Sequence, residues 1–477
     1  MPNDTSSAST ALGAPTRILI LGGGFAGVIA TRRLEKLLGR RRDVEIVLVS
    51  RDNFFLITPL LFEACSGTLE LRHCSQPIRP FLQHATFIEA TVGRIDLDRR
   101  IVSLTVPEGT AQDLSFDHLV LALGAKTNER LIPGSSQAFT FKTIADAIVL
   151  RNHLIERFER ADVETDPERK RELLTVVVIG AGLVGTELTG ELTAFVDEIV
   201  RWYQTVRRDE VRFYLIEAGP RILGEVDPAL AAHAAKVLTK RGVDIRTHTP
   251  VKRIDEDGIT MADEVIKAST IVLSAGIEPN PLVAALPVEK DRHGRIIVEA
   301  SMRSAARPSL WGLGDCAAIP DPSGKPYPSL AQHAVREAKA VAHNIARALR
   351  GEQPRPFVYS QLGVMAALGH FQAIGRVMGI PLTGFPAWWT WRTYYLFQMP
   401  RWSRRIRIMI DWTVALFFHP DIVKVDLAVE SRQLERACAA GADAPMRLVS
   451  GEATRPRLTE RAEPAPMAAA PASRPAP

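Results

Sequence analysis

The stretch Arg17-Ile-Leu-Ile-Leu-Gly-Gly-Gly-Phe-Ala-Gly27 decides the fold of this chain. Its apolar residues, 18–21, form the pattern of a central parallel strand that is buried on both faces. Glycines follow at positions 22, 24 and 27, and residues 28–38 have the pattern of a helix. The first glycine permits a tight turn, the second lets a pyrophosphate approach the backbone, and the third allows close packing of helix on strand. The stretch therefore predicts a turn that binds a dinucleotide, with its phosphates at a helix N-terminus.

A second copy of this pattern lies in the middle of the chain. Residues 173–179 are apolar, and Gly180-Ala-Gly-Leu-Val-Gly185 repeats the glycine spacing before a predicted helix, residues 186–200. One copy alone can be a glycine-rich strand end of any α/β protein, but two copies predict two dinucleotides held by two modules. The economical interpretation is a flavin nucleotide and a nicotinamide nucleotide placed for hydride exchange.

The composition fits a chain of at least two domains. With 477 residues, of which 46% are hydrophobic, the chain can bury two cores of about 150 residues each. The formal charge of +5 is mild, and no long run of Lys or Arg indicates a nucleic-acid partner. Four scattered cysteines, at 65, 74, 316 and 438, favour a reducing compartment over a disulfide scaffold. Residues 1–16 do not resemble a signal peptide, and no uncharged apolar stretch reaches the roughly 18 residues that cross a bilayer.

In each module the second strand should end at a residue that meets a ribose. In the first module the expected strand is 44–49, and Ser50 and Arg51 follow it in place of the usual carboxylate. In the second module the strand 211–216 ends at Glu217, whose carboxylate can accept both ribose hydroxyls and repels a 2′-phosphate. The second module is therefore predicted to prefer NADH to NADPH.

Several further segments are predicted around a flavin. Residues 54–61 have the pattern of an apolar loop, which either walls the flavin or packs in the core. A strand at 116–125 returns the chain to the nucleotide-binding sheet, and the strand at 309–317 brings Asp315 to where it can accept ribityl hydroxyls. A helix that starts at 328 and runs to about 350 would point its positive N-terminus at the reduced ring.

The remaining segments are predicted to connect these parts. Strands are expected at 88–95 and 100–104, a helix at 142–160, and a strand with a tight turn at 271–280. The charged segment 162–171 is predicted to be a linker into the second module. Glu187 and Glu191 lie four residues apart on the second predicted helix and therefore share one face. These two carboxylates either complement the helix dipole or belong to the site.

Together these motifs resemble those of the type II NADH:quinone oxidoreductases, within the flavoproteins that have two dinucleotide-binding domains. The resemblance covers roughly residues 17–430, and its Trp-rich C-terminal part separates it from the flavin disulfide reductases. The matching motifs are Gly22-x-Gly24-x-x-Gly27, Thr58-Pro-Leu-Leu61, Leu121-Ala-Leu-Gly124, Gly180-x-Gly182-x-x-Gly185 with Glu187 and Gly190-Glu191, Ala275-Gly276, Gly314-Asp315, Ala331-Gln332, Ala387-Trp388, Trp391 and Asp411-Trp412.

The resemblance implies an FAD-dependent oxidoreductase that passes hydride from NADH to FAD and two electrons to a membrane quinone, without proton pumping. It implies Glu191 and Gln332 as catalytic residues, with no metal. The cofactor-binding residues that it implies are Gly22, Gly24, Phe25, Ala26, Gly27, Ser50, Arg51, Thr58, Pro59, Leu60, Val92, Gly124, Gly314, Asp315, Ala331 and Gln332, with Gly180, Gly182, Leu183, Val184, Gly185, Glu187, Glu217, Ala275 and Gly276 in the second module.

One departure from the family pattern leaves the acceptor open. The family's Ala-Gln-x-x-x-Gln motif is Ala331-Gln-His-Ala-Val-Arg336 here, so that Arg336 replaces the second Gln. A flavoprotein reductase with another acceptor, or a slow-turnover redox-sensing flavoprotein, stays an alternative. A sulfide:quinone oxidoreductase needs a reactive cysteine pair near the flavin, and no cysteine lies between 74 and 316. A disulfide reductase needs a close pair, for which positions 65 and 74 are poorly spaced.

Residues 387–419 combine aromatic, basic and apolar side chains. On a helix over 406–418, one face carries Ile406, Met409, Ile410, Thr413 and Phe417, and the other carries Arg404, Arg407 and Asp411. An amphipathic helix beside a basic, aromatic-rich segment suits an anionic membrane surface, on the cytoplasmic face of the cell membrane in a bacterial host. A subunit interface, and with it a homodimer, is the alternative.

The predicted fold is α/β, with two Rossmann-like doubly wound modules and a C-terminal amphipathic membrane-binding region. The FAD-binding domain is expected at 15–130 and 286–350, with the NADH-binding domain inserted at 131–285. The C-terminal membrane or dimer region is expected at 351–440. Residues 441–477 are expected to be a disordered tail, because their Ala, Pro and Arg composition cannot bury enough apolar area to fold.

Overall fold

The computed structural model of the chain describes residues 14–106, 109, 111–262, 264–360, 363–399, 401–419 and 422–424. These residues belong to one compact unit. The predictions for residues 1–13, for Cys438 and for the tail 441–477 lie outside the described residues.

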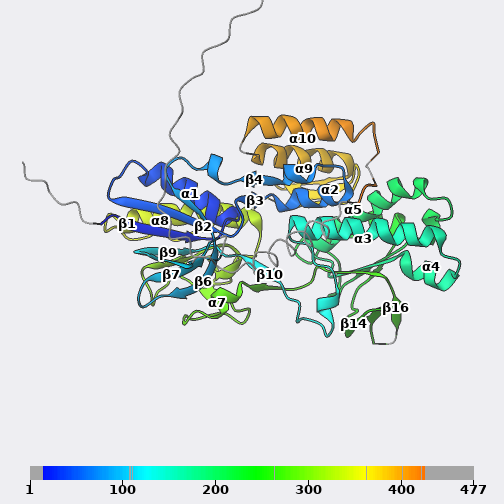
Figure 1. Cartoon of the computed structure of the whole chain (residues 1–477), viewed down its shortest axis with the longest axis horizontal. Coiled ribbons are helices and arrows are strands. Elements are labelled where there is room, and N and C mark those ends of the chain that lie inside the picture. The colour runs from blue at the N-terminus through cyan, green and yellow to red at the C-terminus, as the bar shows by residue number, and fades with distance from the viewer. Residues whose placement is uncertain are drawn as a thin grey trace, which may run out of the picture. The chain divides into compact units, whose positions relative to one another are not determined.

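A five-stranded parallel sheet forms the first module, in the order β20-β9-β1-β2-β5. Figure 1 labels β1, β2 and β9 of this sheet. Its strands are β1 (Thr16–Leu21), β2 (Val44–Ser50), β5 (Thr86–Glu89), β9 (His118–Leu121) and β20 (Leu310–Gly312). The apolar residues predicted as a central strand lie in β1, between β2 and β9, and are fully buried. Helix α1 (Phe25–Leu38) follows the first glycine turn and packs against α8 (Ala331–Ala348).

A four-stranded parallel sheet forms the second module, in the order β13-β12-β11-β17. Its strands are β11 (Thr175–Ile179), β12 (Arg212–Ile216), β13 (Val243–Arg246) and β17 (Thr270–Leu273). Helix α5 (Leu183–Ile199) follows β11 and the second glycine turn, as α1 follows β1. The other long helices of this module are α3 (Ile144–Val163) and α6 (Pro228–Lys240).

Two short antiparallel strands join the modules. The chain leaves the first sheet after β9 through β10 (Ala125–Thr127), and it returns through β18 (Ile277–Pro279) before β20. The four strands of the second sheet all lie between these two crossings. The second module is therefore an insertion between β9 and β20 of the first.

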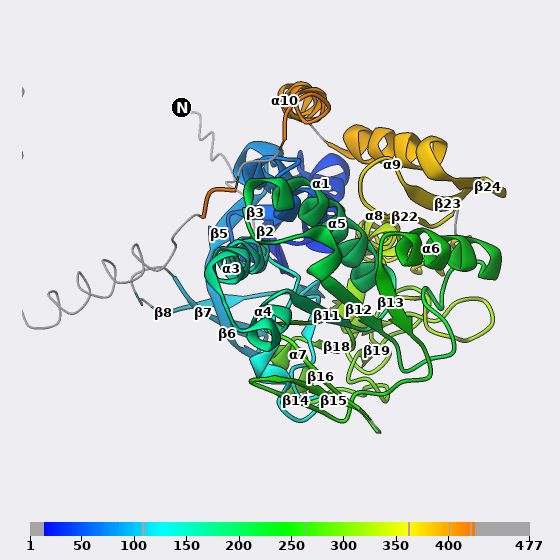
Figure 2. The ribbon, with the colours of Figure 1, turned by 90° about the vertical axis from the view of Figure 1, so that its right-hand side faces the viewer.

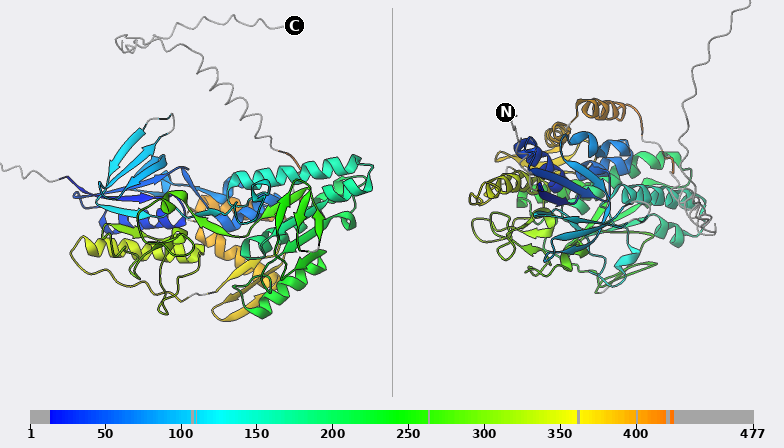
Figure 3. Two further views of the ribbon diagram at one scale, coloured as in Figure 1. Left: turned by 90° about the horizontal axis from the view of Figure 1, so that it is seen from below. Right: turned by 60° about the vertical axis from the view of Figure 1, so that its left-hand side comes forward.

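Smaller sheets complete the described part of the chain (Figures 2 and 3). The cyan strands in Figure 3 belong to a meander next to the first sheet. The antiparallel groups are β6 (Thr91–Asp96) with β7 (Ile101–Thr105) and β8 (Ala111–Ser115), β14 (Arg253–Asp255) with β15 (Gly258–Thr260) and β16 (Val265–Lys267), β3 (Phe54–Leu56) with β4 (Ser75–Pro77), and β22 (Met365–Ala367) with β23 (Ala373–Val377) and β24 (Ile380–Thr383). A short parallel pair joins β19 (Ile296–Ile297) to β21 (Ala317–Ala318).

Four predicted segments are wrong in the structure. The strand expected at 309–317 ends at Gly312, and Gly314–Cys316 form a 3-10 turn that carries Asp315. The strand expected at 88–95 is divided at Ala90: the Ala90 N–H donates the last bond to β2, at the Ser50 carbonyl (2.9 Å), and the residues that follow pair with β7 as β6. The linker expected at 162–171 is the end of α3 and a further helix, α4 (Pro167–Leu173). Asp166 caps α4 by accepting from the Glu168 N–H, and proline at the first position fits the helical backbone.

The apolar loop expected at 54–61 is also wrong. Residues 54–56 form β3, Thr58–Leu60 form a 3-10 turn, and α2 (Leu61–Ser66) begins directly afterwards. Pro59, in the first positions of the turn, favours the start of a helical segment. Apolar composition alone does not predict this start. The segment brings the chain to the second module, where α2 packs against both α3 and α5.

The C-terminal part of the described chain forms two helices, α9 (Gly384–Gln398) and α10 (Trp402–Val414), which lie over α2 in Figure 1. Helix α10 begins and ends four residues before the predicted helix at 406–418. Its inward side carries Ile408 and Trp412, which are buried, whereas Ile406 and Ile410 are about half exposed. Among the described residues, no helix is long and apolar enough to cross a membrane.

Candidate functional site

Both glycine turns lie where the central strand of a sheet ends. Gly22 and Gly180 have φ angles of +112° and +97°, which side chains rarely adopt. A Cβ placed on Gly27 or Gly185 would lie 1.9 Å from the carbonyl oxygen of the first glycine of its turn. The first and third glycines are therefore required by the backbone itself, and the two turns have the same construction.

The middle glycines, Gly24 and Gly182, face open space instead. A Cβ built on either would have nothing within 4 Å. Each is the N-cap of its helix in an extended conformation, and no side chain caps either helix. Free backbone N–H groups with room in front of them form an anion site at a helix N-terminus. The residues present thus fit a pyrophosphate at both turns.

The two strand ends beside these turns differ. Ser50 is buried, and a Cβ on Gly23 would lie 2.3 Å from its hydroxyl, so this small side chain lets the first turn pack closely. Arg51 is exposed and pairs with Asp52 at 3.3 Å. At the second turn the Glu217 carboxylate accepts the Ala181 N–H at 2.8 Å and the Gly219 N–H at 2.7 Å. A carboxylate has about four acceptor positions, so Glu217 keeps capacity for ribose hydroxyls.

Asp315 lines a small pocket after the end of β20. Gly314, with φ of +73°, turns the chain there, and its N–H donates to the buried Glu337 on α8 at 2.8 Å. Burial raises the pKa of Glu337 to about 7. Burial also raises the pKa of Asp315, and Lys142 faces this carboxyl from the connection between the modules. Both residues of the predicted Gly314-Asp315 motif thus line the pocket.

The motif around Gln332 is held by aromatic and backbone contacts. The Gln332 amide donates to the Gly363 carbonyl at 3.2 Å, and its oxygen accepts from the Tyr359 hydroxyl at 3.2 Å. Arg336 donates to the Gln332 backbone carbonyl at 3.0 Å and lies 4.3 Å from the centre of the Tyr359 ring. In this chain Arg336 therefore braces the start of α8, at the position where the family has its second Gln.

Glu187 and Glu191 are buried on the inner face of α5. The Glu187 carboxylate accepts the Ala367 N–H at 2.9 Å, and burial raises its pKa to about 8. The Glu191 carboxylate accepts the Ser66 hydroxyl at 2.6 Å, and burial with the nearby Glu63 raises its pKa. Buried carboxyls with raised pKa values are typical of a functional site. Carboxylates that only complement a helix dipole are usually exposed and ionised, so the structure favours the site interpretation for this pair.

A buried ionic cluster joins α2 to the C-terminal helices. One Glu63 oxygen accepts from the Arg392 guanidinium at 2.9 Å, and the other accepts the Trp412 indole N–H at 2.6 Å. The guanidinium lies 4.1 Å from the Trp388 ring and 4.7 Å from the Trp412 ring. Asp411 also approaches His73 at 2.6 Å. Helices α9 and α10 are thereby fixed to the segment that follows β3.

The structure groups most of the predicted site residues at three places. The first is the carboxyl end of the five-stranded sheet, with Gly22, Gly24, Phe25, Ala26, Gly27, Ser50, Arg51 and Gly124, and with Val92 in the adjoining strand β6. The second is the end of β20 and the start of α8, with Gly314, Asp315, Ala331 and Gln332, whereas Thr58, Pro59 and Leu60 form the turn before α2. The third is the edge of the four-stranded sheet and α5, with Gly180, Gly182, Leu183, Val184, Gly185, Glu187, Glu191, Glu217, Ala275 and Gly276.

Sequence reasoning missed five polar residues that the fold brings to these places. Each is a single charged or hydroxyl residue without a motif, and each meets a partner far away in the chain. The one available signal was a basic residue inside an aromatic-rich run, at position 392. The residues are Glu63, Ser66, Lys142, Glu337 and Arg392.

Comparison with known proteins agrees with this arrangement. Residues 16–338 match the family described as pyridine nucleotide-disulphide oxidoreductase, which sets the class of the protein. A probable NADH dehydrogenase of Dictyostelium discoideum is 32% identical over 416 residues, covering 85% of this chain and 90% of that protein. The type II NADH:quinone oxidoreductase Ndh of Mycobacterium tuberculosis is 30% identical over 421 residues, covering 83% and 87%. The chain belongs to the type II NADH:quinone oxidoreductases, which confirms the resemblance seen in the sequence.

Solved structures show the same fold. The NDH2 protein of Plasmodium falciparum, in complex with NADH, superposes with a TM-score of 0.80 at 20% identity, covering 86% of this chain and all of that one. The sulfide:quinone oxidoreductase of Aquifex aeolicus gives a TM-score of 0.64 at 20% identity, covering 86% and 96%. The predicted α/β fold with two Rossmann-like modules is thereby confirmed.

Proposed function

We propose that this chain holds FAD on the first glycine turn, binds NADH on the second, and reduces a quinone at a membrane surface without pumping protons. The observation that carries the proposal is the pair of glycine turns, identical in construction, in a chain of this family. Bound FAD supplies the redox chemistry, accepting hydride and passing two electrons on. The residues of the chain bind and orient the dinucleotides and the quinone, and they exclude water from the site.

The predicted residues divide between the two dinucleotides. For FAD, the first turn holds the pyrophosphate, Ser50, Arg51 and Val92 lie toward the adenosine, and Asp315 accepts from the ribityl chain. The proposed domain boundaries, at 130/131 and 285/286, lie a few residues after the crossing strands β10 and β18. For NADH, the second turn holds the pyrophosphate and Glu217 the ribose, which favours NADH over NADPH.

The described cysteines argue against sulfur chemistry. Cys65, Cys74 and Cys316 are all buried, and burial raises the pKa of Cys65 and of Cys316 to about 12. A reactive cysteine needs access and a lowered pKa, because the thiolate is the nucleophile. The fold shared with the sulfide:quinone oxidoreductase therefore does not extend to its chemistry at these positions.

The proposal is tested with purified, FAD-loaded protein. We expect NADH oxidation to be stimulated by quinones, with NADH preferred over NADPH, and Glu191→Gln to slow turnover while FAD stays bound. Ferricyanide serves as an acceptor that needs no quinone site. A protein that reduces ferricyanide but none of a series of benzoquinones and naphthoquinones would contradict the quinone part of the proposal.

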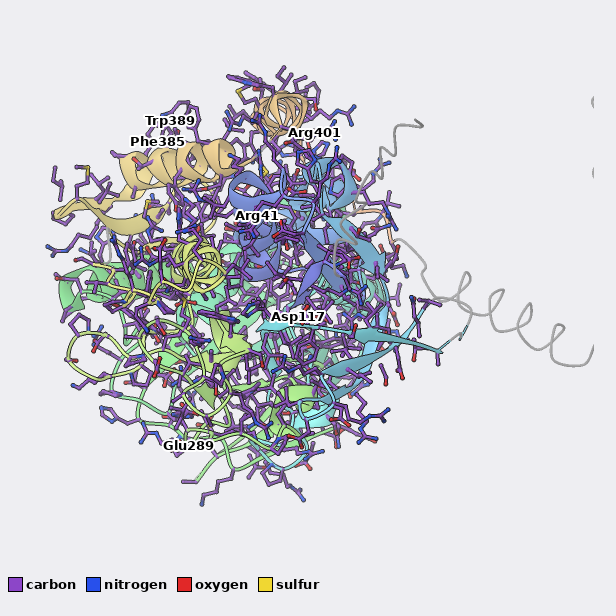
Figure 4. All side chains as sticks on the ribbon, turned by 90° about the vertical axis from the view of Figure 1, so that its left-hand side faces the viewer. Arg41, Asp117, Glu289, Phe385, Trp389 and Arg401 are labelled. Atoms are coloured by element: carbon purple, nitrogen blue, oxygen red, sulfur yellow. The ribbon has the colours of Figure 1, made fainter. Side chains whose placement is uncertain are left out.

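The membrane part of the proposal rests on the outer faces of α9 and α10. Phe385 and Trp389 lie on the outer side of α9 (Figure 4). Large apolar side chains at least two fifths exposed continue along both helices, while Arg401 and Arg407 are exposed beside them. These residues are Phe385, Trp389, Phe397, Trp402, Ile406, Met409, Ile410 and Val414. Aromatic and basic residues together favour an anionic interface, with about 1 kcal/mol for each basic residue near it.

Surface substitutions test this attachment better than truncation. Removing the chain from residue 387 onward would also take away the buried Trp391, Ile408 and Trp412. We expect the triple variant Trp389→Ser, Phe397→Ser, Ile410→Ser to lose sedimentation with anionic vesicles and to slow with long-tailed quinones. Val265→Ser, an equally exposed apolar position on β16, is the control. Wild-type protein that stays off anionic vesicles at low salt but forms dimers would favour a subunit interface instead.

A further inference from the structure

A chain of three hydrogen-bonding side chains connects the protein surface to Glu191. The Ser66 hydroxyl lies 2.6 Å from a Glu191 oxygen and 3.0 Å from the Thr68 hydroxyl. Ser66 and Glu191 are 2% and 7% exposed, whereas Thr68 is partly exposed next to the exposed Gly67. We propose that Thr68, Ser66 and Glu191 form a proton relay from solvent to the quinone-reducing site, a proposal that rests on the proposed function.

The proposed reaction requires such a route because its protons do not balance within the site. A quinone becomes a hydroquinone by taking two electrons and forming two O–H bonds. NADH leaves as NAD⁺ after giving one hydride, which carries both electrons and one hydrogen nucleus. The balance is NADH + H⁺ + quinone → NAD⁺ + hydroquinone, so one proton enters from water in each turnover. A buried site that excludes water needs groups that pass this proton.

The order of donors and acceptors in the chain suits a relay. A hydroxyl donates one hydrogen bond and accepts others, so Thr68 can donate to Ser66 while Ser66 donates to Glu191. When Glu191 gives up its proton, the Ser66 proton moves to Glu191 and the Thr68 proton moves to Ser66. Thr68 then takes up a hydronium proton from solvent, and the proton that left Glu191 ends on an oxygen of the reduced quinone. One solvated proton is thus consumed, and Thr68, Ser66 and Glu191 return to their starting protonation. The Ser66 hydroxyl also lies 3.0 Å from the Glu63 carbonyl, toward which it can turn between transfers.

The groups around Glu191 have opposing effects on the pKa of its carboxyl, which is raised overall. Burial and the Glu63 charge raise the pKa of the Glu191 carboxyl, while Ser66, Arg392 and Arg241 lower it. Glu187 faces it from one turn earlier on α5, and Cys65 from α2. The opposing influences come from α2, α5, α9 and the end of α6, so the carboxyl is neither a permanent anion nor permanently neutral. Glu187 is the next titrating group toward the glycine turn.

The relay is tested with paired substitutions in the FAD-loaded protein. Ser66→Ala and Thr68→Val each remove one hydroxyl, whereas Thr68→Ser keeps it. Thr193→Val is the control, because Thr193 is a buried residue of α5 whose hydroxyl donates to the Gly190 carbonyl at 2.8 Å, within its own helix. We expect quinone reduction at pH 8 to slow at least fivefold in Ser66→Ala and Thr68→Val, and to stay near wild type in Thr68→Ser and Thr193→Val.

A second acceptor separates proton delivery from damage to the site. Reduction of ferricyanide by NADH takes up no proton, so its rate should change less than twofold in all four variants. The slowing of quinone reduction in Ser66→Ala and Thr68→Val, relative to the wild type, should increase with pH, because the proton concentration in solvent falls. Equal slowing with both acceptors would overturn the relay and assign these hydroxyls a structural role. Wild-type quinone rates in Ser66→Ala and Thr68→Val across pH 6–9 would overturn it too.

A readout independent of turnover follows the carboxyl itself. The infrared C=O stretch of protonated Glu191 is identified by its loss in Glu191→Gln. It should move to higher frequency in Ser66→Ala, because the hydrogen bond from the hydroxyl is gone. An unmoved band would contradict the contact on which the relay depends. If the wild-type protein reduced ferricyanide but no quinone, the proposed function would be contradicted. If the wild type reduced quinones and the Ser66→Ala and Thr68→Val variants did so equally well, only the relay would be contradicted.

Discussion

Helices α1 and α5 leave their glycine turns in the same way, yet their buried carboxylates have different environments. On α1, one Glu35 oxygen accepts the backbone N–H groups of residues 83, 84 and 85, each at 2.7 Å. On α5, Glu187 accepts one backbone N–H and Glu191 one serine hydroxyl, and the pKa values of both are raised. All three side chains are less than a tenth exposed.

This difference separates a structural carboxylate from carboxylates suited to chemistry. Three N–H donors stabilise an anion and fix the loop that carries them, so Glu35 is a brace. For Glu187 and Glu191, desolvation by burial outweighs the donors and cations around them, so their pKa values are raised and the carboxyls can exchange a proton in the pH range where enzymes work. The carboxylate on the helix after the first glycine turn is therefore a structural contact, whereas the two on the helix after the second turn are buried titrating groups.

Replacing the middle glycine of each turn by alanine should have the largest effect, on FAD binding at the first turn and on NADH binding at the second. Gly24→Ala and Gly182→Ala place a methyl group into open space, so both proteins should fold. Gly24→Ala should be purified with little FAD, whereas Gly182→Ala should keep FAD and raise the KM for NADH tenfold or more, about 1.4 kcal/mol. Flavin absorbance per protein and steady-state kinetics measure the two outcomes.

Gly224→Ala, also a methyl group in open space, serves as the control for these two variants. If Gly182→Ala lost the flavin and Gly24→Ala changed only the KM for NADH, the assignment of the two turns would have to be exchanged.

Removing the charge of a carboxylate should have opposite effects on the two helices. Glu35→Gln weakens three charge-assisted hydrogen bonds and should cost about 1.5–3 kcal/mol of stability. Glu187 has a folded-state pKa of about 8 against 4.5 for the free group, so it lowers stability progressively as pH rises from 4.5 to 8. Glu187→Gln should therefore stabilise the protein at pH 8.5, by about 2 kcal/mol or more, at about 1.4 kcal/mol per pKa unit.

Thermal unfolding of the FAD-loaded variants at pH 5 and pH 8.5 measures both effects. The stabilisation by Glu187→Gln should nearly vanish at pH 5, where the carboxyl is protonated in the folded protein. A Glu187→Gln protein less stable than wild type at pH 8.5 would show that the anion is well accommodated and would remove the contrast with Glu35.

The strand ends give the smallest expected effect. Glu217→Ser makes the second strand end like the first, where Ser50 stands, and removes both the ribose acceptor and the partner of two backbone N–H groups. We expect the preference for NADH over NADPH in kcat/KM to narrow about tenfold, roughly one charge-assisted hydrogen bond. Glu217→Gln keeps an acceptor for one N–H and should narrow the preference less. Equal kcat/KM for both nucleotides in the wild type would refute the role of Glu217.

Short patterns in the sequence predicted the parts that neighbouring residues decide. Strand β1, helix α1 and their copies β11 and α5 follow from an apolar run and three glycines, because the turn geometry involves only residues within a few positions of one another. Glu217 was predicted at its strand end for the same reason. The segments 54–61 and 162–171 were misjudged, since apolar or charged composition outweighed the helix-starting prolines Pro59 and Pro167.

What the sequence by itself determined was therefore the two nucleotide-binding turns, the modules around them and the family. Only the tertiary structure decided what surrounds the carboxyls of α5, because their partners are distant in the chain. Ser66 and Glu191 are 125 residues apart, and Glu63 and Arg392 are 329 apart. It also decided that the apolar side of α10 faces outward, since Ile408 and Trp412 take the inner side. Helical periodicity places residues on a common face, but only packing against the rest of the fold determines which face is buried.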